Sequence, residues 1–471
     1  MKRILFTLII TLLPNLLFAK SDLISDLKFK ELQFNIPEAH KEKLDDKITY
    51  YSLLSEDFPI AYVSISIYGG MKSSPLIEIP SLLASTLKFG GSESLPGEKL
   101  LSRLEALGAQ LGISAGYDTI TLRLSFLTKD QEEVLTLIDE LINKPALTDT
   151  AFAKAKRDMI ESIRRRNDRT ENLIFRKADE VLFKGLSLGK SENLETVNKI
   201  KKEDLLNYWN AIKTHKNKII KVTGLLDESK LKEKIKTIFS PGKKLGAEPI
   251  DEKLEYSKIL GNFQNDPIQA YVINKDVNQS MVLMTGILPQ HNHPDFFPIQ
   301  LLNYILGGSG FNSYMMQQIR VDRGLAYSAS SYPSFKAEYG VFYAYVMTKN
   351  SSLLEVIDLM KKILSSETIE NIKEAELEKA KTAIINQFVF LFANNNRIVN
   401  NQVRFDEDKM PENYLKTYRE SIRAVKLEDL KRVGKLYLEP SKLKTIIVCP
   451  EEAIKDKLKT KIRILKPEEE I

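Results

Sequence analysis

Alternating apolar and polar residues predict strands in two distant parts of the chain. In segment 61–68 the apolar residues Val63, Ile65 and Ile67 fall on one face, and segment 119–128 repeats the pattern. A period of two is typical of half-buried strands. Later in the chain, segments 279–285 and 340–348 are predicted as matching strands.

A period of three to four residues predicts helices between these strands. Apolar residues recur with this spacing in segments 100–107, 131–142 and 353–364, which indicates amphipathic helices. Strand pairs separated by such helices favour an α+β fold, with a mainly antiparallel sheet in each part and helices packed on one face.

Two short motifs recur at a common spacing. Lys-Ala-Lys at 154–156 returns at 379–381, and Glu-Asp-Leu at 203–205 returns at 428–430, so both pairs are offset by 225 residues. The first pair lies in helix-like runs, predicted at 150–166 and 373–393, and a helix and a short strand follow each Glu-Asp-Leu. This ordered series predicts a duplicated domain of about 220 residues.

The duplication sets the predicted domain boundaries. A polar stretch rich in helix-breaking residues begins at Ser240-Pro241-Gly242 and separates the two parts. We therefore expect a first domain at 20–240, a linker at 241–260 and a second domain at 261–471.

The first 19 residues have the pattern of an export signal. Lys2 and Arg3 precede a mostly apolar run at 4–18, and Ala19 is a small residue suited to cleavage before Lys20. An uncleaved membrane anchor is the alternative, but about 15 apolar residues fall short of the roughly 20 that span a bilayer. We expect an exported protein, periplasmic in a bacterium, with no stable membrane span after cleavage.

Composition excludes several classes of protein. The 471 residues include 69 Lys+Arg and 63 Asp+Glu, a net charge of +6, which is too weak to favour a nucleic-acid partner. The lone cysteine, Cys449, permits neither an intrachain disulfide nor a thiolate metal cluster.

The four histidines offer little catalytic chemistry. Only His291 and His293 are close together, and they could begin a zinc site, but the flanking Pro289 and Pro294 favour solvent-exposed histidines in a loop. The sequence contains no His-x-x-Glu-His, no His-Glu-x-x-His and no Gly-x-Ser-x-Gly motif. Residues 307–310 lack the Gly-Lys-Ser/Thr completion of a phosphate-binding loop, so we interpret them as a turn.

One segment carries a specific signature. Residues 306–328 read Leu-Gly-Gly-Ser-Gly-Phe-Asn-Ser-Tyr-Met-Met-Gln-Gln-Ile-Arg-Val-Asp-Arg-Gly-Leu-Ala-Tyr-Ser. This resembles the second half of the pitrilysin/insulinase family, the inverzincin metallopeptidases, in which a Gly-rich turn and a helix precede Ile-Arg, three residues, and Gly-Leu-Ala-Tyr. The resemblance extends over essentially the whole predicted mature chain. It implies two homologous α+β halves that form half of a clamshell around a peptide chamber.

The family's zinc motif, His-x-x-Glu-His, is replaced in this chain. Its positions fall on Leu82, Ser85 and Thr86, and no histidine occurs between His40 and His215. The resemblance places the third family ligand near Glu161, which we interpret instead as a helix-surface carboxylate beside Arg164 and Arg165. We expect no metal in this chain and, by the same resemblance, zinc in a partner subunit.

The family's substrate-binding pair is retained as Arg320 and Tyr327. The resemblance implies that these residues hold the substrate backbone and stabilise the tetrahedral intermediate. A guanidinium offers fixed donors to carbonyl oxygens, and a phenol can donate to an oxyanion. Alternatively, Arg320 pairs with Asp322 and Tyr327 lies in the core. Arg323 is the neighbour most easily mistaken for Arg320, which ends a helix predicted at 312–321.

Three functional hypotheses follow. The favoured one is a non-catalytic subunit of a zinc peptidase for peptides or unfolded polypeptides, whose homologous partner carries His-x-x-Glu-His. The second is an exported binding or scaffold protein with no part in proteolysis. The third, an autonomous hydrolase, lacks a recognisable nucleophile, base or metal cluster. A heterodimer and a larger assembly both fit the first hypothesis.

Overall fold

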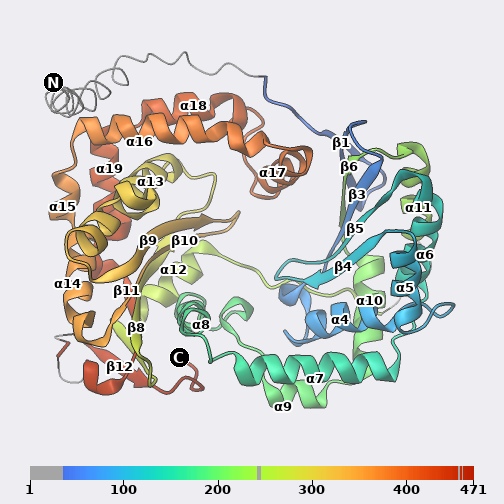
Figure 1. The fold of residues 1–471 in the computed structure, drawn as a ribbon, viewed down its shortest axis with the longest axis horizontal. Coiled ribbons are helices and arrows are strands. Elements are labelled where there is room, and N and C mark those ends of the chain that lie inside the picture. Colours follow the sequence, from blue (N-terminus) through green and yellow to red (C-terminus); the bar gives the residue numbers. More distant parts are fainter. Residues whose placement is uncertain (1–34, 241–245, 455–456, 459) are drawn as a thin grey trace, which may run out of the picture. The chain divides into compact units, whose positions relative to one another are not determined.

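The computed structural model describes residues 35–240, 246–454, 457–458 and 460–471, and residues 37–471 belong to one compact unit (Figure 1). The predicted signal peptide, 1–19, and the first part of the predicted linker, 241–245, lie outside the described residues. A search of the described helices finds none that is both long and apolar enough to cross a bilayer.

The described part of the chain contains two six-stranded mixed sheets, one in each half. Four of the five pairings in the first sheet are antiparallel, and three of the five in the second. The first has the order β1-β2-β6-β3-β5-β4, with the strands β1 His40–Lys43, β2 Ile48–Leu54, β3 Ile60–Tyr68, β4 Gln110–Ala115, β5 Thr119–Leu127 and β6 Lys218–Gly224. The second has the order β12-β7-β11-β8-β10-β9, with the strands β7 Ala270–Asn274, β8 Gln279–Leu288, β9 Ala326–Phe335, β10 Gly340–Lys349, β11 Lys444–Cys449 and β12 Ile462–Leu465.

The helices lie between these strands in the sequence, partly in long runs such as α6–α10 and α14–α19. In the first half they are α4 Ile79–Gly90, α5 Glu98–Ala106, α6 Gln131–Asn143, α7 Asp149–Arg165, α8 Thr170–Leu182, α9 Leu194–Lys199, α10 Lys202–His215 and α11 Glu228–Ile238. After α12 Tyr256–Asn265, which begins within the predicted linker, they are α13 Phe296–Asn303, α14 Leu353–Leu364, α15 Ser366–Glu370, α16 Glu374–Gln387, α17 Asn395–Glu407, α18 Tyr414–Ala424 and α19 Leu427–Val433. The α+β prediction is confirmed.

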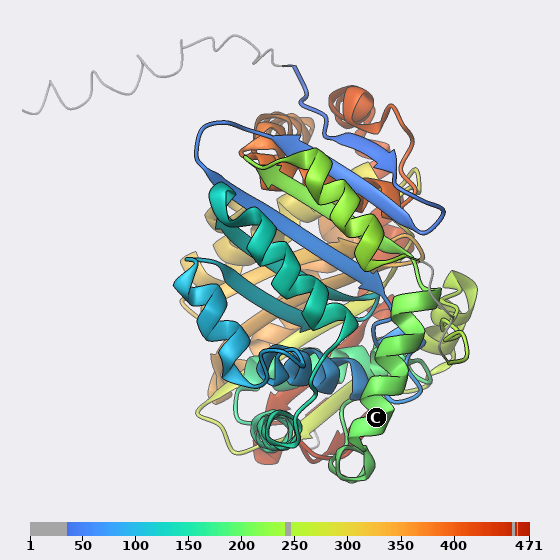
Figure 2. The same ribbon diagram turned by 90° about the vertical axis from the view of Figure 1, so that its right-hand side faces the viewer.

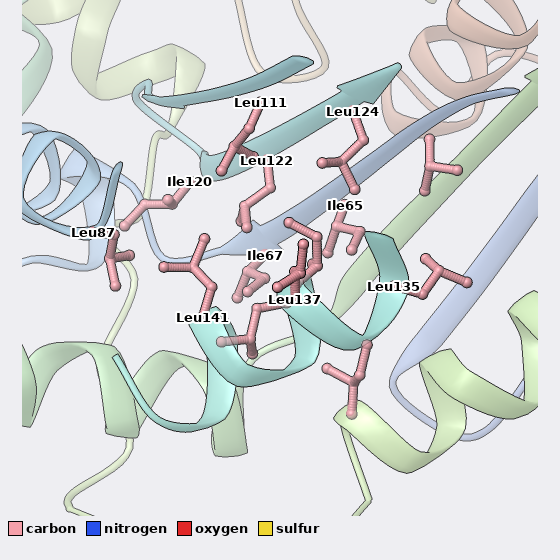
Figure 3. Packing of buried hydrophobic residues seen from close by; sticks show 14 of the residues in the cluster. Ile65, Ile67, Leu87, Leu111, Ile120, Leu122, Leu124, Leu135, Leu137 and Leu141 are labelled. Carbon is pink, nitrogen blue, oxygen red and sulfur yellow. The ribbon is translucent and has the colours of Figure 1, made fainter. Parts of the chain in front are cut away.

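Apolar residues join each sheet to its own helices. In the first half, Leu135 and Leu141 of α6 lie over Ile65 and Ile67 of β3, and all four are at most 3% exposed (Figure 3). Figure 2 shows α6 and α11 in front of the strands of this sheet. The apolar face of β3, which follows a period of two, and the apolar face of α6, which follows a period of three to four, therefore pack together in one core.

The internal repeat corresponds to equivalent helices. The helix pairs α7/α16, α8/α17 and α10/α19 each begin 225 residues apart. The repeated Glu-Asp-Leu starts a helix in both halves, because Asp204 accepts a hydrogen bond from the Lys201 amide at 2.8 Å and Asp429 from the Lys426 amide at 2.9 Å. This carboxylate satisfies a donor that the helix leaves unpaired.

Each half also lends one helix to the sheet of the other half. Helix α8 packs on β8 and β11, and its repeat partner α17 packs on β2 and β6. In both cases the helix covers the sheet face opposite the main layer of helices, a face to which α12 also contributes in the second half. Val399 and Val403 of α17 meet Tyr51 and Ile219, whereas Ile48 and Ile220 face the first core. The predicted arrangement, with helices on one face only, therefore omitted this exchanged helix.

Local differences from the predicted elements occur near the Gly-rich segment. The helix predicted at 312–321 begins at Tyr314 and is a π-helix over Met316–Val321. The turn predicted at 307–310 is partly helical, because α13 continues as a π-helix through Tyr304–Gly308 before a 3₁₀ turn at Gly310–Asn312. The helix predicted at 373–393 ends at Gln387.

Candidate functional site

The Gly-rich segment packs directly against strand β9. A Cβ on Gly307 would lie 2.2 Å from Ser331 Oγ and 2.7 Å from Ser331 N, so a side chain at this position would collide with the strand. Ser330 Oγ donates to the Gly307 carbonyl at 3.2 Å, and Ser331 Oγ donates to Asn303 Oδ1 at 2.7 Å. These contacts fix the start of the signature segment on β9.

The helix that follows ends directly after Arg320. Gly324 has a φ of +65°, its amide donates to the Arg320 carbonyl at 3.0 Å, and the Leu325 amide donates to the Ile319 carbonyl at 3.0 Å. A left-handed glycine after the last helical turn is a common way to end a helix. Strand β9 then begins at Ala326, so Arg320 and Tyr327 lie on either side of one tight reversal.

Arg320 lies beside two aromatic rings. Its guanidinium carbon is 4.6 Å from the centre of the Tyr327 ring and 4.9 Å from that of Phe311. Tyr327 is 82% exposed and Phe311 is 60% exposed. Among the described residues, no carboxylate oxygen lies within 4 Å of the guanidinium nitrogens, so the alternative pairing of Arg320 with Asp322 is not seen. Nor is Tyr327 a core residue.

Phe311 was missed by the sequence analysis. It stands in the Gly-rich segment nine residues before Arg320, and its carbonyl accepts a hydrogen bond from Gln317 Nε2 at 2.5 Å. The available signal in the sequence was a phenylalanine directly after the glycines of a predicted turn. Because its ring lies against the guanidinium, Phe311 restricts the position of the Arg320 side chain.

Arg323 has a different environment from Arg320. Its Nη1 donates to the Gln318 carbonyl at 2.7 Å, at an exposed position on the turn. The two arginines are therefore distinguished by structure, because Arg323 is bonded to the Gln318 carbonyl whereas the guanidinium of Arg320 lies over two aromatic rings.

The positions that replace the zinc motif lie on helix α4. Leu82 and Thr86 are fully buried, and Leu82 belongs to the first core, where it packs with Ile67 and Leu87. Within the described ranges, the Thr86 hydroxyl has no hydrogen-bond partner. Ser85 is partly exposed. A buried leucine occupies a position that the family resemblance assigns to a metal ligand.

Metal-ligating side chains are not clustered in the described ranges. No group of three or more His, Cys, Asp or Glu side chains there is arranged to hold a metal ion. Glu161 Oε1 pairs with Arg165 Nε at 2.5 Å on the surface of α7, which matches its interpretation as a helix-surface carboxylate. Cys449 is buried at the end of β11, and this burial raises the pKa of its thiol to about 12.

The expectation that His291 is exposed was wrong. His291 is 5% exposed, and its Nδ1 lies 2.6 Å from Asp408 Oδ2 among the rings of Phe296, Phe335, Phe405 and Tyr414. His293 is more exposed and lies 3.8 Å from Asp295. The two imidazoles therefore contact different carboxylates, and the contact of His291 with Asp408 anchors the C-terminal cap of α17.

Comparisons with known proteins agree with this fold. Residues 81–192 match the model "Insulinase (Peptidase family M16)", and residues 199–384 match "Peptidase M16 inactive domain". The "Non-peptidase homolog YmxG" of Helicobacter pylori is 24% identical over 85% of this chain and 90% of its own length. An "Uncharacterized zinc protease" of Rickettsia bellii is 23% identical over 70% of this chain and 75% of its own.

A solved structure has a similar fold. The peptidase M16 inactive domain from Pseudomonas fluorescens has a TM-score of 0.76 and 18% identity, and the match covers 88% of this chain and 98% of that one. The two family models together span more than half of the chain, and the chain lacks His-x-x-Glu-His. The chain therefore belongs to the insulinase-type M16 peptidase family, as a non-catalytic homologue.

Proposed function

We propose that this chain is the non-catalytic subunit of a two-chain zinc peptidase. A homologous partner supplies the zinc and His-x-x-Glu-His, and this chain supplies Arg320, Tyr327 and part of the peptide chamber. The substrates are peptides or unfolded polypeptides, because the paired groups recognise backbone carbonyls rather than a particular side chain. Residues 1–19 support export of the chain to the periplasm, where assembly takes place.

The position of Arg320 beside two exposed rings is the observation that carries the proposal. Its guanidinium carbon lies over the rings of Phe311 and Tyr327, at 4.9 and 4.6 Å from their centres, and a guanidinium has its donors along its edges. Such donors can bind the carbonyl oxygens of an extended peptide. In the described part of the chain, no carboxylate within 4 Å competes for these hydrogen bonds.

Tyr327 complements this arrangement. With 82% of its surface exposed, its hydroxyl can reach a ligand, while its ring restrains Arg320. A phenol positioned beside a cation can donate to an oxyanion that forms in the partner's zinc site. The proposed active site therefore requires a second chain that places zinc opposite Arg320 and Tyr327.

Co-expression with an exported homologue that carries His-x-x-Glu-His tests the proposal. The two chains should elute together in gel filtration, the complex should contain zinc, and peptide cleavage should appear only when both are present. An interface of about 2,000 Å² or more is usual for obligate pairs, so the complex should persist at micromolar concentration. Separate elution with no gain of activity on mixing would favour the scaffold hypothesis instead.

A further inference from the structure

Aromatic side chains gather where α8 crosses the second sheet. Tyr332 on β9 lies beside Tyr343 and Tyr345 on β10, with ring centres 5.2 and 6.3 Å apart. Phe175 on α8 contacts the same two tyrosines at 5.6 and 5.7 Å. Tyr332 is 41% exposed, and the other three residues are partly buried. The four rings form a cluster that is open to solvent at Tyr332.

A carboxylate without a cationic partner adjoins this cluster. Asp179 lies one helical turn after Phe175 and accepts a hydrogen bond from the Tyr343 hydroxyl at 3.3 Å. Among the described residues, no Lys, Arg or His nitrogen lies within 4 Å of its oxygens. Burial, opposed by the Tyr343 hydrogen bond and assisted by the nearby charge of Glu180, raises the pKa of Asp179 to about 6.

The neighbouring carboxylate shows what Asp179 lacks. Glu180 is 5% exposed and pairs with Lys177 at 2.8 Å and with Arg176 at 2.6 Å. The ionisable groups that face Asp179 from the packed elements are instead the phenols of Tyr332, Tyr339 and Tyr343. Asp179 is partly buried, and phenols remain neutral at pH 7, so they do not compensate its negative charge.

A cation could contact both the aromatic rings and the Asp179 carboxylate. Ring faces attract Lys and Arg side chains within about 6 Å of the ring centre, and a largely desolvated carboxylate gains from an opposite charge. Arginine suits the site better than lysine, because its planar guanidinium can stack on a ring and still reach a carboxylate. Water alone would leave the charge of Asp179 only partly compensated.

The cluster lies along the same strand as the proposed substrate-binding pair. Tyr332 is five residues after Tyr327 on β9, which corresponds to roughly 17 Å of extended strand. Strand β9 ends the order of the second sheet, so in the described part of the chain its outer edge has no neighbouring strand. An extended polypeptide held at Arg320 and Tyr327 can therefore place a side chain about five residues away near Tyr332.

We propose that Phe175, Asp179, Tyr332, Tyr343 and Tyr345 form a site for the basic side chain, preferably arginine, of an extended polypeptide. The site deepens the proposed function, because it rests on a polypeptide bound at the Arg320–Tyr327 pair. All five residues belong to this chain, so binding itself requires neither the partner nor zinc.

Peptide binding to the isolated full chain tests this site. The probes are two fluorescein-labelled ten-residue peptides that are identical except for one central residue, arginine or its neutral analogue citrulline. Fluorescence anisotropy at about pH 7.5 and low ionic strength, where charge interactions are least screened, gives both dissociation constants. The arginine peptide should bind about tenfold more tightly.

Matched variants locate the preference. Asp179→Asn should abolish it, and Tyr332→Ala should reduce it several-fold. Asp276→Asn, at an exposed loop position, and Tyr62→Ala, at a strand position 43% exposed, should leave it unchanged. The preference should also decline as the pH falls through about 6, because Asp179 then becomes protonated.

Three results would overturn the site: equal affinity for both peptides, an unchanged preference in Asp179→Asn, or no binding of the arginine peptide to the isolated chain. The outcome is separable from that for the proposed function. An arginine preference without complex formation would retain the site and reject the two-chain peptidase, whereas the reverse pair of results would reject the site alone.

Discussion

The guanidinium carbon of Arg320 lies 4.6 Å from the centre of the Tyr327 ring, across a turn that ends a helix and begins a strand. The two residues are seven positions apart in the sequence, and Gly324 makes the reversal between them with a positive φ of 65°. Since Tyr327 is exposed and no described carboxylate pairs with Arg320, both side chains are available to a ligand or to another chain.

Replacing Tyr327 with phenylalanine separates its two roles. The ring stays and continues to restrain Arg320, while the hydroxyl is lost. In the two-chain complex, kcat should fall about 10²-fold with little change in KM, because the oxyanion that the hydroxyl meets develops only in the transition state. Steady-state kinetics check this. A rise in KM as large as the fall in kcat would show that the hydroxyl also binds the substrate in the ground state.

Replacing Gly307 with alanine tests the support of the site. The new Cβ would lie 2.2 Å from Ser331 Oγ and force the signature segment away from β9. Overpacking of this kind costs about 1–3 kcal/mol, so thermal unfolding should begin at a lower temperature. Gly261→Ala is the control, because no atom lies within 4 Å of its Cβ and alanine favours the helix. Equal stability of Gly307→Ala and the parent chain would contradict the close approach.

Replacing Asp179 with asparagine should stabilise the isolated chain at neutral pH. The folded-state pKa is about 6, against a model value of 3.8, so the folded chain binds more protons than the unfolded chain between these values. The free energy of unfolding therefore decreases as the pH rises through this window. Removing the charge should recover up to about 3 kcal/mol at pH 7.5 and little near pH 4.

Thermal unfolding at the two pH values measures this difference. A variant that is less stable than the parent chain at pH 7.5 would show that the charge of Asp179 is compensated in the unliganded protein. Asp276→Asn, which changes an exposed carboxylate, should alter stability at neither pH.

The isolated chain should contain no stoichiometric zinc after purification without chelators. The family's ligand positions carry Leu82, Ser85 and Thr86, and leucine offers no donor to a metal. Elemental analysis checks this, with the complex as the positive control. One zinc per isolated chain would require a site unrelated to the family motif.

Periodicity predicted the regular elements well where the residues are half-buried. Helix α14 has the predicted bounds, and α6 and β5 differ from them by one residue. Strand β8 continues three residues beyond its predicted end, because its last residues are apolar on both faces. Strand β1 could not be predicted in this way, because its sequence, His-Lys-Glu-Lys, contains no apolar residue and therefore shows no hydrophobic period.

Contacts between distant residues could not be predicted from local patterns. His291 seemed exposed beside two prolines, but its partner Asp408 lies 117 residues away. The exchange of α8 and α17 between the sheets likewise depends on tertiary packing, although their 225-residue spacing was present in the repeat. The short turn between Arg320 and Tyr327 was enough to predict that they lie close together. The contact of Arg320 with Phe311 could not be predicted, because it depends on how the Gly-rich segment folds.

The most direct measurement of the central claim is the turnover number of the two-chain complex with Arg320→Ala in this subunit, beside the matched control Arg323→Ala. Arg323 is three residues away and donates to the Gln318 carbonyl, so its loss should have little effect. We expect Arg320→Ala to lower peptide turnover about 10²–10³-fold and to weaken substrate binding, while assembly and the partner's zinc content stay unchanged. Turnover at the parent rate in an intact, zinc-loaded Arg320→Ala complex would contradict a shared active site.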